Sequence, residues 1–176
     1  MVVAAAILVS IAIAPGTIGV LGAGLVIVMV TIAVIDMRSF VIPNWLNVAA
    51  LCLAFVHAAA REPDAMLWSI AIAAMRGAAL ALIFLALRSA YSRIRGRQGL
   101  GLGDVKLAAV AGAWLDWLVI PVAIEVAAIA ALIGYVLRQL FLGRSISATN
   151  RVPFGLFLAP AIWICWVLET TWLAPL

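Results

Sequence analysis

Long apolar stretches, separated only by short polar turns, fill almost the whole sequence. They run over residues 17–35, 42–60, 66–87, 105–142 and 154–172. Most are close to the roughly 20 residues that an α-helix needs to cross a bilayer. The stretch 105–142 is long enough for two shorter spans, and Asp116, Trp117 and Pro121 indicate the turn between them. Inside lipid every backbone polar group must be hydrogen-bonded within the protein, so these stretches predict helices.

The overall composition excludes a soluble globular domain. Hydrophobic residues make up 68% of the chain, charged residues 10%, and the mean hydropathy is +1.28, whereas soluble domains are roughly half apolar. We therefore predict an all-α polytopic membrane protein, a bundle of about six transmembrane helices that forms one domain over residues 1–176. Residues 1–14 predict an extra short N-terminal helix. This segment lacks the basic start of a signal peptide, and the sequence leaves open whether it spans the membrane.

The basic residues predict how the chain is oriented in the membrane. If the helices cross in succession, most of them fall on one side: Arg38, Arg88, Arg93, Arg95, Arg97, Lys106, Arg138, Arg144 and Arg151. The densest group of them, Arg88, Arg93, Arg95 and Arg97, predicts a basic loop over residues 88–97. Arg61 falls on the other side, and Arg76 lies within a span. The positive-inside rule makes the basic side cytoplasmic. No basic patch with interleaved aromatic residues is present, so we expect membrane lipid and no nucleic acid as a partner.

Polar and aromatic residues within the apolar stretches carry further expectations. Arg76 needs a partner because a charge is costly in hydrocarbon, and Glu125 is one candidate. Trp114 and Trp117 fit an aromatic belt at the membrane interface. Cys52 and Cys165 form no CxxC pair, so we expect small core residues rather than a disulfide or zinc site.

A glycine-rich turn delivers one carboxylate to the edge of an apolar stretch. Gly99, Gly101 and Gly103 allow close backbone approach, and Asp104 follows in a position suited to starting a helix. One interpretation is a simple helix cap. The other is a functional site, since an acid at the edge of a membrane span, with Lys106 beside it, is a candidate by default.

A second carboxylate, Asp36, ends the stretch 17–35. Two predicted spans separate it from Asp104, so the chain crosses and returns, and both acids face the same side. Residues 153–155 return to that face after two further spans. Two neighbouring acids can share one proton and act as acid and base on a water molecule, without a metal. Equally, they can be unrelated helix-end groups, Asp36 paired with Arg38 and Asp104 with Lys106.

Three sequence blocks, at residues 35–47, 101–112 and 152–160, together resemble the type IV prepilin peptidase family of membrane aspartic proteases. They match an Asp followed by Ile-Pro-Asn, a Gly-x-Gly-Asp-x-Lys block and a Pro-Phe-Gly turn. The chain is most similar to the short forms found with Flp/Tad-type pilus systems. The three blocks occur in the family's order across most of the chain.

This resemblance implies that Asp36 and Asp104 are the catalytic pair of an endopeptidase in the bacterial inner membrane. The substrate would be a prepilin or pseudopilin whose short basic leader stays in the cytoplasm. We expect Gly101 and Gly103 to permit close approach of the Asp104 turn, and Lys106 and Arg38 to influence ionisation of the acids. The other residues in the matching blocks with an expected supporting role are Pro43, Asn44, Pro153, Phe154 and Gly155, the last three shaping the floor of the site.

The chain also departs from the longer members of the family. Those carry a cysteine-containing cytoplasmic insertion and methylate the newly exposed amino terminus. Because no such insertion or CxxC pair is present, we expect neither zinc nor another cofactor. The sequence argues against methyltransferase activity without settling it. Asp116 is expected to be a turn residue at the opposite membrane side.

Two other functions are compatible with the sequence. A preflagellin-type peptidase would share the chemistry and differ in its substrate. A small transporter or assembly scaffold would be non-enzymatic, with Arg76, Glu125 and the two acids forming a polar pathway.

Overall fold

The computed structural model describes residues 1–14, 16–96, 99–141 and 153–173, which form helices and connecting turns without strands. The α-helices are α1 (Val2–Ile13), α2 (Thr17–Ser39), α3 (Asn44–Arg61), α4 (Met66–Arg95), α5 (Leu102–Trp114), α6 (Val119–Phe141) and α7 (Gly155–Leu168). A 3₁₀ turn, η1 (Pro63–Ala65), precedes α4, and a π-helical turn, η2 (Glu169–Leu173), continues α7. The predicted all-α membrane protein with an extra short N-terminal helix is confirmed.

Four of the described helices are long and apolar enough to cross a membrane: α2, α4 with η1, α6, and α7 with η2. Helices α3 and α5 pack among them. With 13 residues and a rise of 1.5 Å per residue, α5 spans only about 20 Å, less than the roughly 30 Å of a hydrocarbon core. The four long apolar helices make the chain a multi-pass membrane protein. The short helix α5 carries Asp104 in its first turn.

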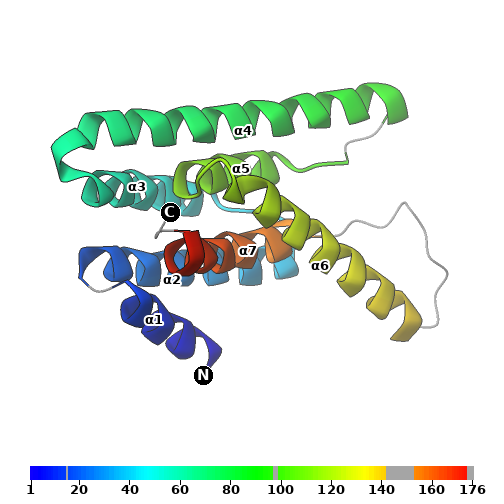
Figure 1. Ribbon diagram of the computed structural model, residues 1–176. Coiled ribbons are helices and arrows are strands. Elements are labelled where there is room, and N and C mark those ends of the chain that lie inside the picture. The colour runs from blue at the N-terminus through cyan, green and yellow to red at the C-terminus, as the bar shows by residue number, and fades with distance from the viewer. Residues whose placement is uncertain (15, 97–98, 142–152, 174–176) are drawn as a thin grey trace.

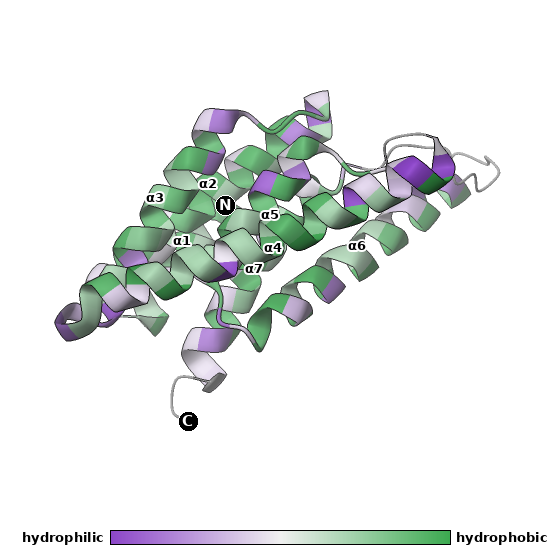
Figure 2. Cartoon of the chain, turned by 90° about the horizontal axis from the view of Figure 1, so that it is seen from above, coloured by the Kyte–Doolittle hydropathy of each residue, from purple (hydrophilic) through white to green (hydrophobic). Residues whose placement is uncertain are grey.

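The helices form a layered bundle (Figure 1). Helices α2 and α7 lie side by side, α3 and α5 pack above them, and α4 runs along the outside of α3 and α5. Helix α6 packs on α7 and leads away from the bundle, while α1 packs on α2. Hydrophilic residues gather towards the ends of the helices, as Figure 2 shows. This distribution matches an apolar middle that is covered by lipid.

The predicted helix boundaries hold in most places, and one fails clearly. Residues 88–95, expected in a basic loop, continue α4 to Arg95. Arginine and alanine are good helix formers, so polarity here marks the exit from the membrane rather than the end of the helix. Helix α2 extends through Asp36 to Ser39, and the turn between α5 and α6 lies where it was expected. The basic residues Arg97, Arg144 and Arg151 lie outside the described part of the chain.

Trp114 lies in the core rather than in an interfacial belt. It is 1% exposed, donates a hydrogen bond from Nε1 to the Ala50 carbonyl (3.2 Å), and stacks on His57 with ring centroids 4.4 Å apart. Trp166 donates its own Nε1–H to His57 Nε2 at 3.2 Å. Trp117 is exposed, as an interfacial residue would be. Of the two cysteines expected in the core, Cys165 is buried, whereas Cys52 is exposed and lies outside the core.

Glycines allow the closest helix contacts. A Cβ atom on Gly112 of α5 would lie 2.6 Å from the Arg76 carbonyl oxygen and 2.9 Å from the Cα of Gly77 on α4. On α2, Gly22 faces the ring of Trp166 and Gly19 faces the α1 backbone, too closely for any side chain. Such contacts between small residues are how membrane helices pack without a hydrophobic driving force.

We predict that Gly112→Ala lowers the free energy of unfolding by about 1–3 kcal/mol, because the new methyl group meets backbone that cannot move aside. Chemical unfolding of the detergent-solubilised protein measures the change. Gly24→Ala is the matched control, since its Cβ would lie 3.6 Å from the Leu53 side chain, an ordinary contact. Equal stability of the two variants would contradict the packing described for α4 and α5.

Candidate active site

Asp36 lies in the last turn of α2 and points at the start of α7. Its side chain is buried, with the residue 5% exposed, and Oδ2 accepts a hydrogen bond from the Leu156 backbone N–H at 2.9 Å. The Gly155 backbone also lies close to this carboxylate. The first N–H groups of a helix have no partner within it and form its positive end, so the start of α7 is a natural site for a carboxylate.

Gly155 makes this contact possible. A Cβ atom at this position would lie 2.8 Å from Asp36 Oδ2 and 2.7 Å from Ile42 Cδ1. No side chain fits there without moving Asp36 or the turn between α2 and α3. Gly155 therefore lies beside the candidate site, as the sequence predicts. Its role there is steric, because only glycine lets the α7 backbone come this close to Asp36.

Asp104 lies in the first turn of α5, three residues after Gly101, which directly precedes the helix. Its Oδ2 accepts a hydrogen bond from the Gly101 N–H at 3.1 Å, so the carboxylate does cap its helix. This cap uses only part of the carboxylate's capacity to accept hydrogen bonds, since a carboxylate has about four acceptor positions. The Gly155 backbone N–H lies close to Asp104 as well. The start of α7 is therefore near both acids.

Both acids line one cleft of about 290 Å³ between the end of α2 and the start of α5. Its other lining residues come from the α2–α3 turn and the two helix starts: Phe40, Val41, Ile42, Asn44, Gly101, Leu102, Gly103 and Lys106. A Cβ on Gly103 would lie 3.1 Å from the Ile42 Cβ. The predicted close approach at Gly103 is therefore made to the α2–α3 turn.

The described cations do not neutralise these acids. Lys106 Nζ donates to the Asn44 side-chain oxygen at 2.6 Å, and Arg38 is exposed on the last turn of α2. Across residues 1–14, 16–96, 99–141 and 153–173, neither Asp36 nor Asp104 forms an ion pair. The interpretation in which Arg38 and Lys106 each pair with one acid is therefore wrong. An effect of these cations on ionisation stays a prediction.

The remaining predicted site residues lie around the cleft with less direct contacts. Pro43 directly precedes α3, and Asn44 is its first residue, held by Lys106. Phe154 precedes α7, and its carbonyl accepts the N–H groups of Phe157 and Leu158. Pro153 and Phe154 are half-buried. Their expected role in the floor of the site stays a prediction.

Two supporting residues were missed by sequence reasoning. Arg88 on the extended part of α4 donates from Nη1 to the Leu100 carbonyl at 2.6 Å, and Tyr91 packs its ring against Gly99. Both contacts support the turn that leads into Asp104. The only sequence signal for them was the basic character of residues 88–97, which we interpreted as a loop.

The partner of Arg76 is Asp116, at the end of the bundle opposite the acids, and not Glu125. Glu125 is exposed on α6. A charge in the apolar part of a helix is stabilised by the nearest acid that can reach it, and the end of α5 lies directly beside Arg76. The polar pathway proposed for a transporter, through Arg76, Glu125 and the two acids, is thus split between distant parts of the structure.

Comparison of the sequence with known proteins identifies its family. Residues 23–137 match the model of the type IV leader peptidase family. The chain is 33% identical over 140 residues to a prepilin leader peptidase/N-methyltransferase of Aeromonas salmonicida strain A449, covering 78% of this chain and 45% of that protein. It is 42% identical over 101 residues to leader peptidase HopD of Salmonella typhimurium strain LT2, covering 57% of this chain and 59% of that protein.

A prepilin leader peptidase/N-methyltransferase of Pseudomonas aeruginosa strain PAO1 is 35% identical over 75 residues, covering 42% of this chain and 25% of that protein. The chain spans less than half the length of the Aeromonas relative. No solved structure matches it. The matched segment 23–137 covers well over half of the chain and contains both Asp36 and Asp104, and the chain therefore belongs to the type IV leader peptidase family.

Proposed function

We propose that this protein is a membrane aspartic endopeptidase that removes leader peptides from prepilins or pseudopilins, with Asp36 and Asp104 as its catalytic pair. The observation that carries the proposal is the meeting of two carboxyl groups from distant parts of the chain in one open cleft. Both lie near the start of α7 and have no ion-pair partner in the part of the chain that the structure describes. Family membership and the names of the relatives favour the same reaction.

The chemistry requires a single proton on the pair. Two carboxylates held close together do not both ionise readily, so one is protonated and the other is not. The ionised group removes a proton from a water molecule, whose oxygen attacks the peptide carbonyl carbon. The protonated group donates to the carbonyl oxygen. Proton transfer to the amide nitrogen then breaks the C–N bond and releases a carboxyl and an amino terminus.

The place of the cleft fits a substrate that lies partly in the membrane. The cleft opens at the ends of α2 and α5, where apolar helices give way to polar turns. The described basic residues Arg38, Arg88, Arg93, Arg95, Lys106 and Arg138 belong to the same end of the bundle. By the positive-inside rule this end faces the cytoplasm. A prepilin in the bacterial inner membrane would present the junction between its leader and its apolar helix at this depth.

We expect Asp36→Asn and Asp104→Asn each to lower cleavage by about 10²–10⁴-fold, because each removes one of the two proton-transfer groups. Cleavage of a co-expressed candidate prepilin, measured by mass spectrometry of the released leader, tests this. Asp64→Asn, an exposed acid in η1, is the matched control and keeps full activity. Full cleavage by either active-site variant, with normal accumulation in membranes, would exclude the proposed mechanism.

Gly155→Ala is expected to lower cleavage by about 100-fold even though alanine is the better helix former. The added Cβ would push on Asp36 Oδ2 and on Ile42, so the acid moves out of position. The same leader-release assay measures the loss, with Gly24→Ala as the control glycine. Unchanged activity in Gly155→Ala would show that the α7 backbone does not position Asp36.

Chelation should leave the reaction unchanged, since every proton transfer in the proposed mechanism runs through the two carboxyl groups. Purified enzyme in detergent is assayed with and without EDTA, and a zinc protease in the same buffer shows that chelation is complete. Loss of cleavage that added metal restores would argue against a two-aspartate mechanism.

A further inference from the structure

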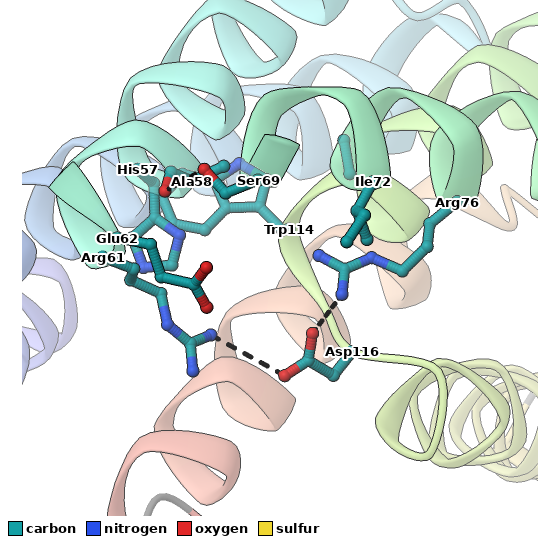
Figure 3. Close-up of a pocket in the computed structure, with 10 residues that line it drawn as sticks. His57, Ala58, Arg61, Glu62, Ser69, Ile72, Arg76, Trp114 and Asp116 are labelled. Atoms are coloured by element: carbon teal, nitrogen blue, oxygen red, sulfur yellow. Dashed lines mark hydrogen bonds and ion pairs between the residues drawn. The ribbon is translucent and has the colours of Figure 1, made fainter. Parts of the chain in front are cut away.

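A cluster of charged side chains lies at the end of the bundle opposite the two acids. Figure 3 shows three of its members, Arg61, Arg76 and Asp116. We call it the distal cluster and define it by Arg61 of α3, Arg76 of α4, Asp116 after α5 and Glu169 after α7. Arg61 Nη1 lies 2.8 Å from Glu169 Oε1 and 3.8 Å from Asp116 Oδ2. Arg76 Nη1 is paired with Asp116 Oδ1, and the Asp116 backbone N–H donates to Glu169 Oε2 at 3.2 Å. One cluster therefore joins four helices.

Two members of the distal cluster, Glu169 and Arg76, are largely shielded from solvent. The side chain of Glu169 is 5% exposed and that of Arg76 is 11% exposed. The side chains of Arg61 and Asp116 are 41% and 47% exposed, but removing either leaves a buried charge, on Glu169 or on Arg76, without its ion-pair partner. The helix ends that carry these groups are accordingly held in one relative position.

The cluster and the catalytic cleft lie at opposite ends of the same two helices. Helix α5 carries Asp104 in its first turn and Asp116 two residues past its last. Helix α7 begins at Gly155, and the Leu156 N–H in its first turn donates to Asp36. Glu169 directly follows this helix. Since Asp36 is held by the start of α7, the separation of the two acids depends on how α5 is placed along α7. Asp116 and Glu169 set that placement at the distal end.

The neighbouring glycine contacts do not make the cluster redundant. Gly77 and Gly112 bring the backbones of α4 and α5 together and so determine how closely the two helices lie. Glycine surfaces have no side chains that interlock along the helix axis. The directional pair of Arg76 with Asp116, one turn away, supplies the constraint along that axis.

We propose that the distal cluster is a positioning device that holds α5 in the register that brings Asp104 to Asp36. The effect on cleavage rests on the proposed function, whereas the effect on helix position does not. Arg76 and Asp116 are the principal positioning residues, because Asp116 pairs with Arg76 on α4 and is joined to Glu169 after α7 by Arg61 and by its own backbone N–H.

Two readouts test the proposal on the full chain in detergent or bilayer. The first is the distance distribution between spin labels at Met37→Cys and Leu102→Cys, exposed positions next to the two acids, with Cys52 and Cys165 replaced by alanine. The second is the kcat and KM of prepilin cleavage. Arg76→Gln and Asp116→Asn are expected to broaden the distances and to lower kcat by about 100-fold with KM little changed, because a misplacement of about 1 Å has that effect.

Arg76→Lys keeps the positive charge and is expected to recover most of the narrow distribution and of kcat. Glu125→Gln, an exposed acid of α6 outside the cluster, is the matched control and behaves like the parent chain. If Asp116→Asn does not accumulate in membranes, the comparison of Arg76→Gln with Arg76→Lys decides the question.

Parent-like distances in Arg76→Gln and Asp116→Asn would overturn the proposal, whatever their activity. Loss of activity without a change in distances would likewise show that the cluster does not act through helix position. If the parent chain cleaves no prepilin, the proposed function fails, and the distance measurements still decide whether the cluster sets the position of α5.

Discussion

The arrangement of the cleft depends on the contact between the Asp36 carboxylate and the Leu156 N–H in the first turn of α7. This contact joins residues 120 positions apart in the sequence. It gives a buried carboxylate a backbone hydrogen bond without a neutralising cation among the described residues, as the proposed proton transfer requires. It also explains why the start of α7 tolerates no side chain at residue 155. The α2–α3 turn and the start of α5 line the cleft beside this contact.

The two ends of the bundle use acids differently. At one end, two acids without ion-pair partners among the described residues line an open cleft. At the other, the acids Asp116 and Glu169 are bound to arginines from neighbouring helices. In the proposed function the first pair of acids reacts, whereas the second pair joins helices. The short helix α5 carries one acid of each kind.

The fold could be predicted largely from hydropathy, because membrane spans are long, apolar and bounded by polar turns. Counting spans also placed Asp36, Asp104 and residues 153–155 on one face before any coordinates. The wrongly predicted side-chain partners have a common origin in contacts between distant helices. Trp114 stacks on His57 instead of lying at the interface, and Lys106 reaches Asn44 rather than Asp104. No local pattern distinguishes these partners, since each is determined by which helices become neighbours.

The most direct test of the paired carboxylates uses a peptide that spans a prepilin leader junction and carries a hydroxyl-bearing tetrahedral isostere in place of the scissile amide. Its affinity for the purified protein is compared with that of the amide peptide. Two carboxyl groups acting on one water predict binding that is tighter by about 100-fold or more, because the isostere mimics the transition state. They also predict that Asp36→Asn and Asp104→Asn each abolish this preference. Equal affinity for the two peptides, or a preference that survives in either variant, would contradict the account.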